Sequence, residues 1–402
     1  MQPPGLIGPC PLLPANNIWN VRVDNLPVDP NSDNYIQAMG AATGLHPDFG
    51  SAEWEGGPIG IPYNLVPGGQ PGVTVQFDYA DESDSGPYPI PVSPKIEWGG
   101  DHHILIVDQD HCTLYEMWDS RQEGGNWYAG SGAIFNLNSN ALRHDGWTSA
   151  DAAGLPILPG LARYEEVASG AIRHALRFTV RGTQYEHYLW PARHWACTIC
   201  DPNMPPMGQR FRLKASFNIS SYSPQTQIIL QALKTYGMIV ADNGTDWYIS
   251  GAPDPGWRDD YLVDELSTVL GSDFEAVDES SLMVDPNSGE VHINPSTTTG
   301  SATDMTQHSA KLNGTVNPNG DSTTYYFQWG PTTSYGNTTP TQSAGSGTSD
   351  VAVSANLTGL TPNTTYHYRL VAVNSAGTTN GSDMTFKTKG NAMPWLLLLL
   401  GD

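Results

Sequence analysis

Positive charge is scarce in this chain of 402 residues, which has 18 lysines and arginines against 41 aspartates and glutamates. The deficit is concentrated in residues 1–296, where 36 acidic side chains face 14 basic ones. Such a surface repels nucleic-acid phosphates and anionic membranes. We therefore expect no nucleic-acid partner. The negative charge is typical of a secreted protein that acts on neutral partners. Binding of Ca²⁺ by some of these carboxylates is also possible.

Familiar catalytic motifs are missing as well. The sequence has no GxSxG, no P-loop, no GxGxxG after a strand and no HExxH, which argues against common esterases, nucleotide hydrolases, dehydrogenases and zinc proteases. The apolar run in "PWLLLLLGD" is far shorter than the roughly 20 residues of a membrane span. No basic and apolar leader opens the chain. We expect a mature secreted form, located outside the cell or at its surface.

Glycine (42), proline (32), tyrosine (18) and tryptophan (12) are abundant, a mixture typical of turn-rich β proteins. Four cysteines permit two disulfides in a secreted chain. Three pairings are open, and we expect Cys10 with Cys112 and Cys197 with Cys200, because "CTIC" is short enough for a local loop. Zinc at "CTIC", with His194 three residues before it, is the alternative.

Hydrophobic patterning predicts a β-rich first domain with a few helices, of β-sandwich or jelly-roll class, over residues 1–293. Strands are expected at 73–83, as a pair formed by 170–180 and 185–195, and as a strand, Asn-Gly turn and strand within 237–251. Helices are expected from Pro224, behind a Ser223 cap, to Gly237, and over 259–270.

The C-terminal part resembles a bacterial fibronectin type III domain over residues 303–388. The resemblance rests on "AKLNGTVNPNG", "TTYYFQWGPTTSYG" and "LTGLTPNTTYHYRLVAVNSAGT", with Leu360 to Tyr366 resembling the tyrosine-corner segment. It implies a β-sandwich domain at 303–389 that acts as a spacer or adhesive module. A Ser/Thr-rich linker is expected at 294–302 and an apolar tail at 390–402. Segments of residues 1–296, such as "GLHPDFG", resemble an uncharacterised family of secreted bacterial proteins and imply no activity.

The stretch "GGDHHILIVDQDHCTLYEMWDS", residues 99–120, predicts a hairpin with acids and histidines at its open end. A turn around Gln109-Asp110 places His103 opposite Glu116, with Asp101 roughly 7 Å along the same face. A His–carboxylate pair with a second carboxylate suits acid/base catalysis and permits a two-carboxylate glycosidase. Asp101, His103 and Glu116 are the predicted catalytic residues. A paired sheet rim with no catalytic role is the alternative.

Other side chains are candidates for binding. Trp118, Trp127 and His194 are predicted to contact substrate, since sugar rings stack on aromatic faces; Trp127, Trp147 and Trp257 are the tryptophans expected to be exposed. His103 and His174 are candidate ligands of a transition metal. The loop "GLHPDFG" places His46 and Asp48 among turn residues, where function often lies.

These observations favour a secreted carbohydrate-active protein, a hydrolase that uses clustered carboxylates and a histidine on a polysaccharide or cell-surface glycan. The alternative is a non-catalytic adhesin or fibre subunit, which would self-associate by pairing its apolar C-terminal strand with a neighbour.

Overall fold

The computed structural model describes residues 5–390, which fall into two compact units with a boundary between Val291 and His292. We call residues 1–291 the first unit and 292–402 the second unit. The predicted mainly β class is confirmed, since strands outnumber helices in both units. No helix in the described part of the chain is long and apolar enough to cross a membrane.

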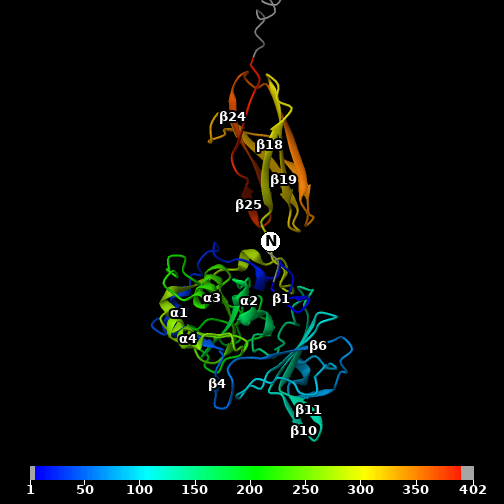
Figure 1. Cartoon of the computed structure of the whole chain (residues 1–402), viewed down its shortest axis with the longest axis vertical. Helices are drawn as coiled ribbons and strands as arrows, with labels where there is room; N and C mark the ends of the chain where they lie inside the picture. Colours follow the sequence, from blue (N-terminus) through cyan, green and yellow to red (C-terminus); the bar gives the residue numbers. More distant parts are fainter. Residues whose placement is uncertain (1–4, 391–402) are drawn as a thin grey trace, which may run out of the picture. The chain divides into compact units, whose positions relative to one another are not determined.

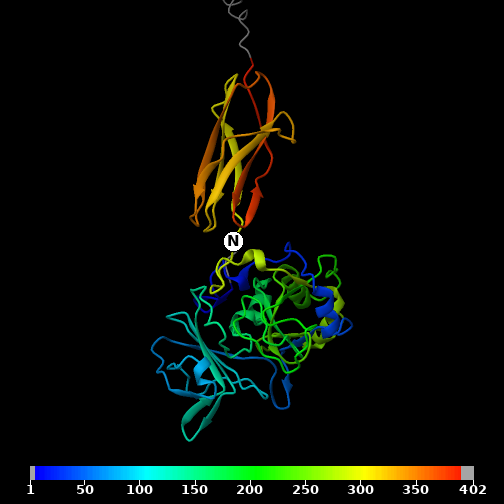
Figure 2. The ribbon, with the colours of Figure 1, turned by 180° about the vertical axis from the view of Figure 1, so that it is seen from behind.

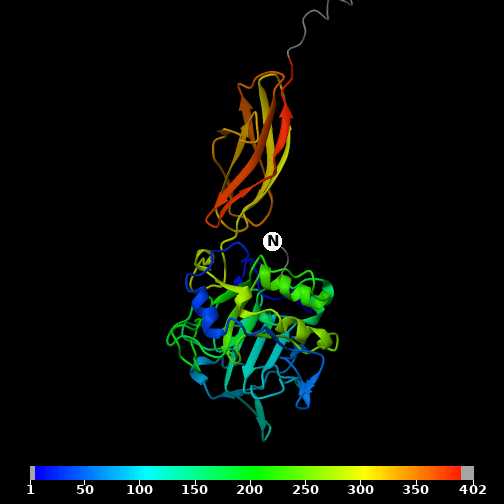
Figure 3. The ribbon, with the colours of Figure 1, turned by 90° about the vertical axis from the view of Figure 1, so that its left-hand side faces the viewer.

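A four-stranded sheet forms one half of the first unit. Its spatial order is β12 (Ser131–Asn136), β9 (Thr113–Trp118), β8 (Ile104–Asp108) and β6 (Tyr63–Val66). Figure 3 shows strands of this sheet, coloured cyan to teal, side by side. A three-stranded sheet lies in the same half: β10 (Arg121–Glu123), β11 (Asn126–Ala129) and β7 (Val75–Phe77). β8 is buried on both faces, as its unbroken apolar run "ILIV" predicts.

A six-stranded mixed sheet forms the other half of the first unit. Its spatial order is β17 (Phe274–Val277), β14 (Arg210–Leu213), β15 (Met238–Asn243), β13 (Leu176–Val180), β16 (Tyr248–Ser250) and β3 (His46–Asp48). One face is aromatic, where Phe178 and Phe211 pack edge-to-face and both contact Trp247. Side chains alternate along strands, so Arg177 and Arg210 lie on the opposite face, which is polar.

Helices accompany the six-stranded sheet. They are α1 (Ser32–Met39), α2 (Tyr164–Ser169), α3 (Pro224–Thr235) and α4 (Asp259–Ser267). Figure 1 shows α1, α3 and α4 on the left of the first unit and α2 near its middle, with β6, β10 and β11 on the other side. The helix predicted from Pro224 is confirmed, with Gly237 beyond its end in the left-handed region at φ 68°. Two short pairs complete the unit: β1 (Leu6–Ile7) with β2 (Cys10–Pro11), and β4 (Glu53–Trp54) with β5 (Gly57–Pro58).

The second unit is a β-sandwich, seen in yellow to red in Figure 2. One sheet holds β18 (Ser296–Thr303), β19 (Ser309–Asn317) and β23 (Val351–Thr358); the other holds β20 (Thr323–Gly330), β21 (Asn337–Thr338), β22 (Gln342–Gly345), β24 (Thr365–Asn374), β25 (Gly377–Asn380) and β26 (Met384–Lys387). The predicted tyrosine corner is present, because the backbone N–H of Thr361 donates to the Tyr366 hydroxyl at 3.0 Å.

Both expected disulfides, Cys10–Cys112 and Cys197–Cys200, are confirmed. The linker predicted at 294–302 is wrong, because β18 occupies most of it and pairs with β19. Its threonines alternate between the sandwich core and solvent, and the Thr299 hydroxyl accepts a hydrogen bond from the Leu370 amide. Of the predicted tail, residues 391–402 lie outside the described residues.

Two predicted strand pairs are also wrong. β15 and β16 do not pair with each other; each pairs with β13, one on either side. The connecting turn crosses the end of β13, where the Gly244 amide donates to the Val180 carbonyl at 2.8 Å. Residues 185–195 form no strand and therefore do not pair with 170–180. Short-range turn signals cannot reveal a strand that inserts between two sequence neighbours.

Candidate active site

The polar face of the six-stranded sheet centres on Arg177. Its guanidinium donates two hydrogen bonds of 2.7 Å to Asp151 and one of 2.5 Å to the Ser250 hydroxyl, and it lies 3.4 Å from Asp242. Burial alone would lower the pKa of Arg177, but Asp151 outweighs burial and the net shift is upward. Arg177 is therefore a fixed positive charge under this face.

Asp242 lies beside this ion pair and remains 24 % exposed. Desolvation raises its pKa to about 8, helped by the negative charge of Asp151 and opposed by Arg177. A carboxyl group that is neutral near pH 7 and still reached by solvent can donate a proton or a hydrogen bond.

Asp48 occupies the same face on the edge strand β3. Its side chain is exposed, yet the surrounding protein desolvates it enough to raise its pKa. The carboxylates of Glu97 and Asp101 raise this pKa further, whereas Arg177 and His46 lower it. Asp48 therefore lies within electrostatic reach of acids that come from a different segment of the chain.

Glu97 reaches this place from the segment before β8 and is 15 % exposed. Its Oε2 lies 2.5 Å from His103 Nδ1, and the His103 Nε2 lies 3.0 Å from the Ala150 carbonyl. Burial alone would lower the pKa of His103, but Glu97 raises it to about 9. His103 is thus an imidazolium near neutral pH, and it holds the Glu97 carboxylate in one orientation.

Two exposed tryptophans are connected to the Glu97 segment through Gly57. Trp98 follows it in the chain, is 53 % exposed and packs its ring against Gly57, where an added Cβ would come within 2.1 Å of the ring. Trp54, which is 67 % exposed, is the strand partner of Gly57. Exposed indole faces next to carboxylates are a common setting for sugar rings, because the apolar side of the sugar covers the indole.

The predicted catalytic residues share this neighbourhood, but not in the predicted pairing. Glu116 lies opposite Leu105 rather than His103, because the turn has four residues and Asp108 pairs with Thr113. The Asp108 carboxylate closes this wider turn by accepting from the Asp110 and His111 amides. The pairing of β8 with β9 is therefore shifted by two residues from the predicted one. Such a shift leaves each side chain on the same face of the sheet and changes only its cross-strand partner.

Glu116 is fully buried, out of reach of a substrate. Its carboxylate accepts hydrogen bonds of 2.9 to 3.1 Å from the Ile157 and Leu158 amides. Burial raises its pKa to about 7, while these amides lower it. Asp101 is exposed and accepts a 3.2 Å hydrogen bond from Trp118 Nε1. Asp101 is therefore an exposed acid of the site, held by Trp118, and His103 holds Glu97. Glu116 instead fixes the backbone at Ile157 and Leu158.

The remaining predicted binding residues are dispersed. Trp127 is 9 % exposed and packs in the core with Val75 of the neighbouring strand β7, so its ring has little surface for contacting substrate. Trp257, also expected at the surface, is 2 % exposed. His194 is partly buried, with Nδ1 2.9 Å from the Ala152 carbonyl. The glycines and acids beside Trp127 and Trp257 suggested exposure, but tertiary packing covers both rings.

The predicted metal ligands do not converge. His103 is engaged by Glu97 and Ala150, whereas buried His174 lies 3.0 Å from Glu166 and 2.7 Å from the Ala175 carbonyl. Within residues 5–390 no group of three or more His, Cys, Asp or Glu side chains is placed to hold a metal ion. The metal prediction for His103 and His174 therefore has no structural support.

Sequence reasoning missed Glu97, Asp151, Arg177 and Asp242 as site residues. Asp48 had a signal, since "GLHPDFG" is a glycine- and proline-bounded segment. Nothing in the spacing of the other four indicates that an arginine of β13 meets these acids. Asp242 lies on the neighbouring strand β15, and Glu97 and Asp151 come from segments between strands, so the meeting depends on the tertiary fold.

No family model matches this chain, and no curated protein matches it. Solved structures similar to part of it include the sensor domain of the anti-sigma factor RsgI4 of Pseudobacteroides cellulosolvens, at 23 % identity over 24 % of this chain and 96 % of that chain, with a TM-score of 0.21. A computationally redesigned β-sandwich protein matches at 26 % identity over 25 % and 100 %, with a TM-score of 0.19. A fibronectin type III domain of human fibronectin type III domain containing protein 3 matches at 18 % identity over 26 % and 94 %, with a TM-score of 0.18.

Proposed function

We propose that this protein is an extracellular glycan hydrolase whose reacting carboxyl groups are Asp48 and Glu97. The proposal is carried by one observation: these two solvent-reached acids, from separate segments of the chain, lie within electrostatic reach of each other. A pair of carboxyl groups flanking the scissile bond is what most glycoside hydrolases require.

The environments of the two acids suit different roles. Desolvation and neighbouring acids raise the pKa of Asp48, which favours the protonated form that a general acid needs. Glu97 Oε2 lies 2.5 Å from His103 Nδ1, a contact that fixes the direction of this carboxyl group, as a base or nucleophile requires. His103 positions Glu97 and does not itself touch the substrate, since it is 2 % exposed.

The rest of the site supports a neutral, ring-shaped substrate outside the cell. Trp98, which follows Glu97 in the chain, and Trp54, whose strand partner Gly57 packs on the Trp98 ring, are both exposed. The strongly negative first unit would repel an anionic polymer. Two disulfides fit an oxidising compartment, which supports secretion.

The second unit supports a different candidate, an adhesin or spacer. A sandwich with a tyrosine corner is a module that connects or displays other domains. This role is compatible with hydrolysis by the first unit, and it becomes the main function if the first unit has no activity.

The test is release of reducing sugars from a panel of plant, fungal and bacterial polysaccharides, with and without a chelator. We expect cleavage by the wild type and a loss of about 100-fold or more for Asp48→Asn and for Glu97→Gln. The matched control is Glu123→Gln, an exposed acid of β10 that should leave the rate unchanged. Full activity in Asp48→Asn would contradict the assignment, and no cleavage by the wild type would favour the adhesin or spacer.

A further inference from the structure

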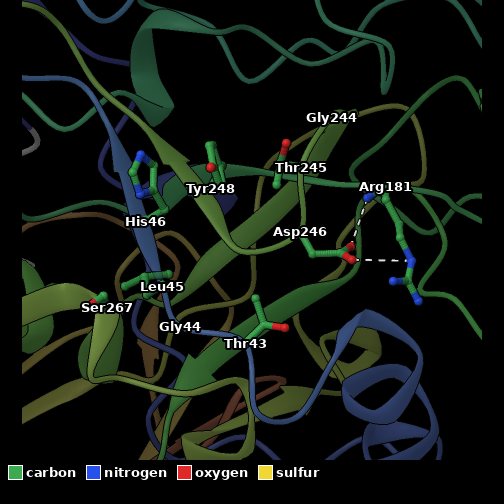
Figure 4. A pocket seen from close by; sticks show the side chains of 10 residues that line it. All are labelled: Thr43, Gly44, Leu45, His46, Arg181, Gly244, Thr245, Asp246, Tyr248 and Ser267. Atoms are coloured by element: carbon green, nitrogen blue, oxygen red, sulfur yellow. Dashed lines mark hydrogen bonds and ion pairs between the residues drawn. The ribbon is translucent and has the colours of Figure 1, made fainter. Parts of the chain in front are cut away.

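A pocket of about 480 Å³ opens at the start of β3, the edge strand that also carries Asp48 (Figure 4). His46, which lines it, lies two positions before Asp48 on β3. Side chains two apart on a strand share a face and are separated by roughly 7 Å. The His46 wall of the pocket therefore lies roughly 7 Å from Asp48 along β3, close enough for His46 to lower the pKa of Asp48.

One wall of the pocket is an aromatic platform. The His46 ring stacks on the Tyr248 ring with centroids 4.2 Å apart and an angle of 28°. Within the described residues, neither the His46 ring nitrogens nor the Tyr248 hydroxyl has a hydrogen-bond partner. Burial lowers the pKa of His46, so its ring is neutral near pH 7 and offers one donor and one acceptor.

The remaining walls carry hydroxyl groups and cancelled charge. Thr43 and Thr245 line the pocket. Asp246 accepts from the Arg181 amide at 2.9 Å and lies 3.4 Å from Arg181 Nε, as the dashed lines in Figure 4 show. A pocket with an aromatic platform, neutral donors and acceptors and no net charge matches a neutral sugar ring better than a phosphate or an amine.

We propose that this pocket binds the sugar unit next to the bond cleaved at Asp48 and Glu97, so that the protein acts within glycan chains rather than on terminal sugars. This proposal rests on the proposed function, which places the cleaved bond at Asp48 and Glu97. The platform of His46 and Tyr248 would add affinity only for oligosaccharides long enough to reach from the reacting acids into the pocket.

The test measures binding rather than cleavage, so it is independent of catalysis. The full chain is titrated by calorimetry at low temperature with cellohexaose, xylohexaose and chitohexaose and with the corresponding dimers. We expect one hexamer to bind at least about tenfold more tightly than its dimer, and Tyr248→Ala to remove most of that difference. Tyr248→Phe should keep it. Tyr185→Ala, an exposed tyrosine outside the pocket, is the matched control.

A second readout reports directly on the pocket in the wild-type protein. Diethyl pyrocarbonate acylates neutral imidazoles, and mass spectrometry of the His46 peptide should show protection by the bound hexamer and little protection by the dimer. Equal affinity for hexamer and dimer, unprotected His46, or no binding by any oligosaccharide would overturn the inference. Binding with protection but no hydrolysis would keep the pocket and refute the proposed catalysis. Hydrolysis with neither tighter hexamer binding nor protection of His46 would keep the proposed catalysis and refute the pocket.

Discussion

The two units bury very different polar side chains. In the described part of the second unit, the buried polar residues are threonines: Thr299, Thr323, Thr339 and Thr388. The first unit buries ionisable groups throughout, among them His103, Glu116, Asp151, Arg163, His174, Arg177 and Arg210. A hydroxyl group needs one or two partners, whereas an ion taken from water costs several kcal/mol unless its charge is matched.

This difference is the one we expect between a core that only joins two sheets and a core that supports the proposed reaction site. A sandwich that only holds two sheets together is built from apolar side chains and hydroxyl groups. The first unit instead places buried ions next to carboxyl groups that solvent can reach, and these ions contribute to the pKa values of Asp48 and Asp242. Perturbing buried charge should therefore affect the first unit strongly and leave the second unit unchanged.

The largest effect is expected from Arg177→Met. The variant leaves Asp151, 1 % exposed, without its cationic partner and should lower the free energy of unfolding of the first unit by about 3–5 kcal/mol. Scanning calorimetry should show the first unit's transition at lower temperature and the second unit's transition unchanged.

A double variant sharpens this result. Arg177→Met with Asp151→Leu removes both charges and should recover much of the lost stability, because a buried ion pair can be replaced by apolar side chains. The control is the exposed ion pair of Arg258 and Asp260. Arg258→Gln should have no measurable effect on stability, because water already screens this pair. If Arg177→Met does not lower the unfolding free energy of the first unit, the buried charges are not the basis of the difference between the units.

Sequence signals predict correctly those elements that depend on residues close together in the chain. The helix at 224–235 starts at Pro224 and is followed by Gly237, two signals that act within one turn, although the Ser223 hydroxyl donates to Glu265 and does not cap the helix. The tyrosine corner forms because Tyr366 reaches only five residues back to Thr361. The strand crossing of β13 between β15 and β16 depends on which strands meet in space, and no pattern along 238–250 specifies that.

The candidate site divides in the same way. His103 and Asp101 were predicted because they cluster within one hairpin, and both lie at the site. Their decisive partner, Glu97, lies just outside the hairpin, where its spacing from His103 follows neither a strand nor a turn rule. His103 and His174 look alike in sequence, and each is engaged by a glutamate, but only Glu97 also lies within reach of Asp48.

A medium effect is expected from Glu116→Gln, through pH. The folded-state pKa of Glu116 is raised to about 7 from an ordinary value of 4.5. Its contribution to stability is therefore fully present below pH 4.5 and is lost as pH rises through about 7. The loss amounts to roughly 3 kcal/mol. Glutamine keeps an acceptor for the Ile157 and Leu158 amides and does not ionise.

Chemical denaturation at a series of pH values between 4 and 8 checks this prediction. The stability of Glu116→Gln relative to wild type should rise across that range, in the first unit alone. Glu123→Gln, at an exposed position, should run parallel to wild type. Parallel curves for Glu116→Gln would mean that folding does not raise the pKa of Glu116.

The smallest effect is expected in the second unit, from Tyr366→Phe. Loss of the hydroxyl leaves the Thr361 amide without its acceptor and should lower the unfolding free energy of the second unit by about 1–2 kcal/mol, a change that calorimetry can detect. Tyr326→Phe is the matched control, since its hydroxyl has no partner among the described residues. A neutral polar contact contributes less than a buried ion pair, so this loss should stay below that of Arg177→Met. A loss as large would show that the second unit depends on its few polar contacts as strongly as the first depends on its ions, and the contrast between the two cores would then fail.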